Sequence, residues 1–95
     1  MKPSEALRLN REQVRRIVAA HHARNARVFG SVLRGDEEGS DLDILIDPTP
    51  ETTLMDIGAI RHELRTLLKV YVDVLTPRGL PEKFRAQVLA EAAPL

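Results

Sequence analysis

The segment that most constrains this chain joins a glycine-flanked turn to a strand with two acidic side chains. The turn covers residues 30–35 (GSVLRG), and the strand covers residues 41–46 (DLDILI). Side chains alternate along a strand, so Asp41 and Asp43 point to one face, with Cα atoms about 6.8 Å apart. The apolar residues between and after them point to the other face and predict a core there. Two carboxylates at this spacing can hold a metal ion, a layout typical of metal-dependent phosphoryl or nucleotidyl transfer.

Composition narrows the class of protein. With 95 residues, we expect a single domain over residues 1–95. No run approaches 18 apolar residues, which argues against a membrane span, and residues 1–5 do not begin a signal peptide. The absence of cysteine excludes disulfides and Cys-ligated zinc. These features suit a cytoplasmic protein of a prokaryote.

The charge balance argues against nucleic acid as the main substrate. Fourteen Lys and Arg residues face fourteen Asp and Glu residues, so the formal net charge is zero. Domains that bind nucleic acid are usually basic, because Lys and Arg neutralise phosphates. DNA or RNA is therefore disfavoured as the main substrate, although a net charge of zero is compatible with a local basic patch.

Periodicity predicts helices that alternate with strands. A helix is expected from Asn10, with Gln13 placed as in a capping box. A strand over residues 26–29 runs into the turn, where residues 31–34 are expected to form a short helix that Gly35 ends.

The second half repeats this alternation. A long helix is expected from about Thr53, followed by a strand over residues 70–75 and a last helix with Pro81 in its first turn. The apolar stripe expected to face inward on the last helix is Phe84, Val88 and Ala92. Alternating elements imply an α/β (α+β) fold with a small mixed sheet of three or four strands flanked by helices. The second and third strands are joined through a helix, as parallel neighbours are, and the short link between the first two allows an antiparallel pair.

Asp73 is the third acidic residue of the candidate site. It lies in the middle of the strand over residues 70–75, where an unpaired buried charge is costly. A neighbouring strand with Asp41 and Asp43 supplies a reason, because three clustered carboxylates repel one another unless a cation neutralises them. Mg²⁺ suits such oxygen ligands, and two ions about 3.5–4 Å apart would clamp the attacking and leaving oxygens.

The turn before the acidic strand suits a phosphate. Gly30 allows close approach to the backbone, and Ser31 offers a hydroxyl beside the N–H groups that open the short helix. Arg34 either contacts phosphate through its guanidinium or forms a salt bridge with Asp41 or Asp36.

Together these residues resemble the nucleotidyltransferase superfamily typified by DNA polymerase beta. Its signature is Gly-Ser, about ten residues, Asp-x-Asp, and a later strand Asp. Here it reads Gly30-Ser31, nine residues, Asp41-Leu42-Asp43, and Asp73. The wording and short length are most similar to the minimal nucleotidyltransferase (MNT) domains. One departure is Val32, where many relatives have Arg.

The resemblance implies a polymerase beta-like fold and a specific role. MNT domains of this kind are antitoxins of type VII-like toxin–antitoxin systems, bound to a HEPN-domain ribonuclease toxin as a hetero-oligomer. They transfer AMP from ATP to a tyrosine of the toxin. By this analogy Asp41 and Asp43 bind both Mg²⁺ ions, Asp73 completes one metal site and helps to deprotonate the acceptor, and Gly30 and Ser31 grip the triphosphate.

Other interpretations remain open at this point. Asp41 and Asp43 are also compatible with a solvated strand face, although Gly30-Ser31 and Asp73 disfavour it. The domain would also act as an antitoxin if it only masked the toxin by binding, without chemistry. A small-molecule nucleotidyltransferase is less favoured, because such enzymes generally need a further helical domain for the acceptor. No base-reading residue is identifiable.

Overall fold

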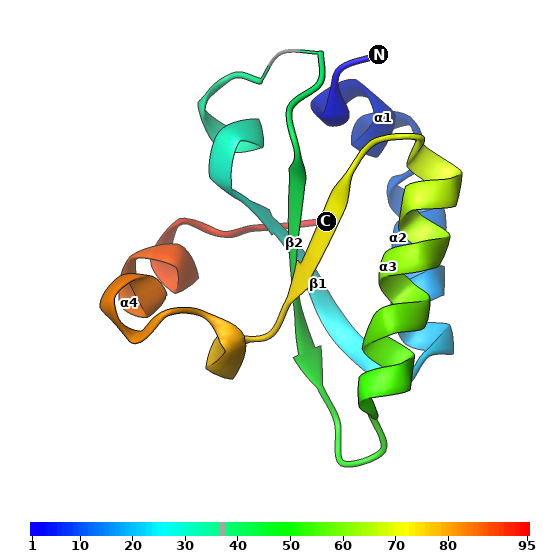
Figure 1. Cartoon of the computed structure of the whole chain (residues 1–95), viewed down its shortest axis with the longest axis vertical. Helices are drawn as coiled ribbons and strands as arrows, with labels where there is room; N and C mark the ends of the chain where they lie inside the picture. The colour runs from blue at the N-terminus through cyan, green and yellow to red at the C-terminus, as the bar shows by residue number, and fades with distance from the viewer. Residues whose placement is uncertain (37) are drawn as a thin grey trace.

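A four-stranded mixed sheet runs through the molecule, with helices on both faces (Figure 1). The computed structural model describes residues 1–36 and 38–95. Its elements are α1 (Pro3–Leu9), α2 (Arg11–Ala20), β1 (Ala23–Phe29), the 3-10 helix η1 (Gly30–Arg34), β2 (Leu42–Pro48), α3 (Leu54–Leu68), β3 (Val72–Leu75), the 3-10 helix η2 (Pro77–Gly79), α4 (Glu82–Glu91) and β4 (Ala93–Pro94). The strand order is β3-β2-β1-β4, with β2 and β3 parallel and the other pairs antiparallel. The predicted fold class, an α+β domain with a small mixed sheet, is therefore confirmed.

The main core lies between the sheet and the layer formed by α2 and α3. The inward side chains of β2 are fully buried, and so are those that meet them from the two helices: Leu42, Ile44, Ile46, Val14 and Ile60. Burying each large aliphatic side chain contributes about 1.5–3 kcal/mol. A slip of one residue would turn this apolar face of β2 outward, so the core fixes which residues β2 presents on its other face.

The start of α3 agrees with its sequence signals. Thr53 is the N-cap, and its hydroxyl accepts a hydrogen bond from the Asp56 backbone N–H at 3.1 Å. The Asp56 carboxylate in turn accepts from the Thr53 backbone N–H at 2.8 Å, which completes a capping box. Within the described ranges even this helix, the longest at 15 residues, is too short for a membrane span.

The N-terminal prediction is wrong in two respects. The sequence did not indicate α1, and Asn10 forms no capping box. Asn10 is instead the residue that caps the C-terminus of α1. Its side-chain amide turns back and donates to the Ala6 carbonyl at 2.8 Å. The strand β1 also begins at Ala23 rather than residue 26, because a register irregularity near Asn25, whose φ is +54°, lets the pairing with β2 continue.

The predicted inward stripe of α4 is also wrong. None of its described residues is buried, and Phe84 is 50% exposed. The reason is visible in Figure 1. The helix α4 lies on the face of the sheet opposite α2 and α3, and among the described residues no further layer of helices covers α4 there. The chain then returns to the sheet through β4, which pairs with Arg27 and Val28 of β1.

A buried carboxylate anchors α1 to the loop before β2. Asp36 is only 8% exposed and accepts hydrogen bonds from the Ser4 backbone N–H and the Ser4 hydroxyl, each at 2.7 Å. Burial opposes ionisation of Asp36, but the two bonds from Ser4, helped by the charge of Lys2, outweigh it and lower the pKa of Asp36. Asp36 is therefore occupied by α1, and the alternative pairing of Arg34 with Asp36 or Asp41 is absent among the described ion pairs.

Removal of this anchor should lower stability in a pH-dependent way. We expect Asp36→Ala to lower the free energy of unfolding by about 1–3 kcal/mol at pH 7. The folded pKa lies below the unfolded value of about 3.9, so the contribution of Asp36 is complete above that pH and is lost as the pH falls through the folded pKa. Urea unfolding should thus show a large difference in the free energy of unfolding between the wild-type chain and Asp36→Ala at pH 7. At pH 3 this difference should be smaller. Ser4→Ala, which keeps the backbone bond, is the control and should cost less.

Candidate active site

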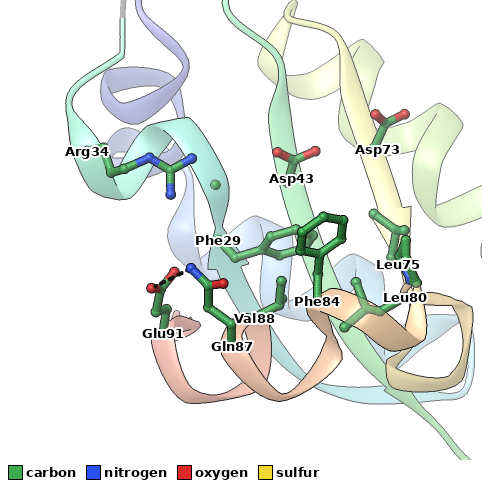
Figure 2. Close-up of a pocket in the computed structure, with 12 residues that line it drawn as sticks. Phe29, Arg34, Asp43, Asp73, Leu75, Leu80, Phe84, Gln87, Val88 and Glu91 are labelled. Atoms are coloured by element: carbon green, nitrogen blue, oxygen red, sulfur yellow. Dashed lines mark hydrogen bonds between the residues drawn. The ribbon is translucent and has the colours of Figure 1, made fainter.

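Asp43 and Asp73 lie side by side on the face of the sheet opposite α2 and α3. They are partners in the register of the parallel strands β2 and β3, directly after the buried pair Leu42 and Val72. Neighbouring strands lie about 4.8 Å apart, so the two side chains leave the sheet next to each other. Figure 2 shows both carboxylates above the same cavity, which they line. The structure thus brings together two of the three predicted acidic residues as neighbours.

The electrostatic environment of Asp43 follows from this arrangement. Its partial burial raises the pKa of Asp43, and the nearby charges of Asp73 and Asp41 raise it further. Arg34 acts in the opposite direction and lowers it. The site is therefore a cluster of like charges that is only partly compensated by the residues around it.

Asp41 stands just outside the strand. It is exposed and precedes β2, and its backbone carbonyl accepts a hydrogen bond from the Ser31 hydroxyl at 3.4 Å. Its charge reaches Asp43, but Asp41 is not among the residues that line the cavity. The Ser31 bond joins the Gly-Ser turn to the residue that precedes β2.

Position 30 requires glycine for two reasons, its backbone conformation and the lack of space for a side chain. It lies at the junction of β1 and η1 with φ +80°, a conformation that L side chains rarely adopt. A Cβ at this position would stand 2.5 Å from Oδ2 of Asp43. The backbone of the turn therefore approaches the Asp43 carboxylate as closely as a residue without a side chain allows.

The cavity beside these residues has a volume of about 490 Å³. One end is polar, with the two carboxylates, Gly30 and the exposed Arg34 of η1. The other end is formed by apolar residues of the strands, of the link between η2 and α4, and of α4, together with two polar residues of α4: Phe29, Leu75, Leu80, Pro81, Phe84, Val88, Gln87 and Glu91. A ligand with a charged end and a flat, less polar end fits these two halves.

Arg65 is a neighbour of the site that sequence reasoning missed. From the last turn of α3 its Nε donates to the Val72 carbonyl at 2.9 Å, and its Nη2 lies 3.8 Å from Oδ1 of Asp73. Its guanidinium also stacks 4.0 Å above the ring of the exposed Tyr71. Arg65 therefore holds the end of β3 that carries Asp73. No local signal marks it, because the contact depends on how α3 crosses the sheet.

The histidines belong to other parts of the molecule. His21 contacts Glu63 and His22 contacts Asp56, so both link the end of α2 to α3. The His22 carbonyl also accepts bonds from Thr49 and Thr52. These contacts give both histidines a structural role.

The acidic residues fit a hard divalent cation in chemistry and placement. Carboxylate oxygens are the ligands that Mg²⁺ prefers, and Asp43 and Asp73 present theirs side by side. In the described part of the chain no three Asp, Glu or His side chains converge closely enough to form a ready-made metal site. The Asp43–Asp73 pair is therefore the centre of the candidate site, and Asp41 remains a predicted ligand.

Comparison with protein families and curated proteins agrees with this geometry. The family described as "Nucleotidyltransferase domain" matches residues 11–95. A Methanocaldococcus jannaschii protein named provisionally as a protein adenylyltransferase (MJ0435) is 34% identical over 80% of this chain and 83% of its own length. "Protein adenylyltransferase MntA" of Thermococcus cleftensis is 32% identical over 87% of this chain and 93% of its own length.

Solved structures share the fold. A structure described provisionally as a minimal nucleotidyltransferase is 46% identical and covers 97% of this chain and 95% of its own, with a TM-score of 0.86. A chain of a "toxin-antitoxin with AMP-PNP" crystal structure is 18% identical and covers 90% of this chain and 71% of its own, with a TM-score of 0.74. At that identity the second likeness concerns the fold alone.

Proposed function

The chain belongs to the nucleotidyltransferase domain family, and from that premise we propose that it transfers AMP from ATP to a tyrosine of a partner toxin, acting as an antitoxin. Relatives at 32–34% identity carry the name protein adenylyltransferase, which favours a protein acceptor. Structural neighbours come from toxin–antitoxin complexes, which favours a toxin as the partner. We propose a HEPN ribonuclease as that toxin, on the resemblance of the Gly-Ser and Asp-x-Asp segments to MNT antitoxins.

One observation carries the chemical part of this proposal. Asp43 and Asp73 are register partners, and the backbone of Gly30 approaches Asp43 so closely that no Cβ fits between them. A phosphate bound at the Gly30-Ser31 turn would therefore lie next to the two carboxylates. Phosphate binding and metal ligands at one point are what nucleotidyl transfer requires.

In the proposed reaction, the tyrosine oxygen of the acceptor attacks the α-phosphorus of ATP. The new O–P bond forms as the bond between the α-phosphorus and the bridging oxygen breaks, and pyrophosphate leaves. Asp73 is exposed enough to face the acceptor, and we assign its carboxylate the phenolic proton. Gly30, Ser31 and Arg34 bind the triphosphate so that the leaving group points away from the acceptor.

We propose that two Mg²⁺ ions bind at this site. Their ligands would be Asp43, Asp73 and the predicted ligand Asp41. When bound, Mg²⁺ supplies positive charge that polarises the α-phosphate and stabilises the leaving pyrophosphate. The same charge offsets the repulsion within the acidic cluster. Arg65 positions the Asp73 strand through its bond to the Val72 carbonyl.

Intact-mass spectrometry tests the proposal. The HEPN partner is incubated with this chain, ATP and Mg²⁺, and we expect one or more mass increments of AMP that peptide fragmentation maps to tyrosine. Asp73→Asn should give no increment. An unchanged partner mass with a stable complex would replace transfer with masking, and an unchanged mass with no complex would contradict the antitoxin role altogether. AMP found on a small molecule instead would support a small-molecule nucleotidyltransferase.

A further inference from the structure

The half of the cavity formed by α4 has no role in the chemistry described so far. One face of α4 lines the cavity with three exposed residues on consecutive turns, Phe84, Gln87 and Glu91. We call these three residues the base face. Figure 2 shows Phe84 below Asp43, and Gln87 and Glu91 below Arg34. An aromatic side chain that leaves half of its surface exposed inside a cavity presents a flat apolar face to whatever enters.

Phe84 has the surroundings of a stacking platform. Phe29 lines the same cavity, and Lys83 Nζ lies 5.7 Å from the centroid of the Phe84 ring. Val88 of α4 lines the same side of the cavity, so the walls beside the ring are apolar. Planar heterocycles such as nucleobases bind such rings by stacking.

The other two residues of the base face form a polar edge. Gln87 Nε2 donates to Glu91 Oε1 at 3.3 Å, which fixes the amide and leaves its carbonyl and second N–H available. This edge carries a carboxylate, which attracts groups that donate hydrogen bonds. A base with an exocyclic amine therefore suits the α4 end, and the triphosphate is assigned to the end with Gly30 and Arg34, where Mg²⁺ held by Asp43 and Asp73 would offset their negative charge.

We infer that the base face of α4 is the nucleobase site, in which the base stacks on Phe84 and its amino-bearing edge meets Gln87 and Glu91. The inference rests on the proposed function in so far as that function requires a nucleotide. Adenine matches the edge, since its N6 amine donates to a carboxylate or amide oxygen and its N1 accepts from an amide N–H. Uracil presents a carbonyl where adenine has the amine, so this edge discriminates against it.

Calorimetric titration of the full chain with Mg²⁺ present tests the inference without a transfer reaction. Two probes are used: the ATP analogue with a methylene bridge between the α- and β-phosphates, which is not cleaved there, and inorganic tripolyphosphate, which has no base. Phe84→Ala should weaken binding of the analogue about tenfold or more and change binding of tripolyphosphate less than about twofold. Phe84→Tyr, which keeps a ring, should restore the affinity for the analogue.

Leu89→Ala is the matched control, because Leu89 is an exposed apolar residue of α4 that does not line the cavity. It should leave both affinities unchanged. The wild-type chain should also bind the ATP analogue about tenfold or more tightly than the corresponding UTP analogue, and a Gln87→Ala, Glu91→Ala double variant should reduce that preference.

Several outcomes would overturn the inference. Equal losses for both probes in Phe84→Ala would show that the ring shapes the cavity rather than binds a base, and no loss for either would remove Phe84 from the site. A wild-type chain that does not bind the ATP analogue would also exclude it. Phe84-dependent binding of the analogue with no AMP on the partner would instead keep the base site and contradict the proposed function.

Discussion

Asp43→Asn is expected to reduce AMP transfer by about 10³-fold or more while the fold remains intact. The substitution keeps the size of the side chain and removes the charge beside Asp73 that the proposed reaction needs. It places no new group in the core, because Asp43 leaves the sheet on the side opposite the buried face of β2. The measurement is the rate of AMP incorporation into the partner at saturating ATP.

The stability of this variant provides an independent readout. Like charges from Asp73 and Asp41 contribute to the raised pKa of Asp43, so the amide should leave the melting temperature unchanged or slightly higher in the absence of divalent ions. Glu51→Gln removes the same charge from an exposed turn and should affect neither property. Transfer at the wild-type rate in Asp43→Asn would contradict the assignment of the site, and a large drop in melting temperature would make Asp43 a structural residue.

Strand alternation correctly predicted on which face of the sheet Asp43 lies. It placed Asp43 on the face opposite Leu42 and Ile44, and the burial of those two residues confirms it. That Asp43 faces Asp73 rather than its neighbours depends on the register between β2 and β3, which is set by packing across the core. The sequence therefore indicated which residues share a face but left their pairing to the tertiary structure.

The α4 prediction failed for a related reason. The spacing of Phe84 and Val88 correctly indicates that they share one face of a helix, but spacing does not say what covers that face. Here it is a cavity rather than the core, because α4 is the only described α-helix on its side of the sheet. Arg65 could not be foreseen either, since its bond to the Val72 carbonyl and its approach to Asp73 depend on the position of α3 beside β3.

The need for glycine at position 30, by contrast, is local to the turn and could be predicted from the sequence. Gly30→Ala is therefore expected to lower both the stability of the fold and the rate of AMP transfer. An L residue at φ +80° costs about 1–2 kcal/mol of backbone strain. The new Cβ would also stand 2.5 Å from Oδ2 of Asp43, so the carboxylate must move. A displacement of about 1 Å at a reacting centre can cost about 100-fold in rate, and we expect a loss of transfer of at least that size.

Gly35→Ala separates these two causes. Gly35 has φ +88°, so alanine meets the same backbone strain, but among the described residues, its chain neighbours apart, no heavy atom lies within 4 Å of the Cβ position. Chemical denaturation should therefore show similar losses of stability, about 1–2 kcal/mol, for both variants, whereas only Gly30→Ala should lose transfer. If Gly35→Ala lost transfer equally, strain in the turn would explain the defect, and the close approach of Gly30 to Asp43 would have no part in holding the catalytic carboxylate.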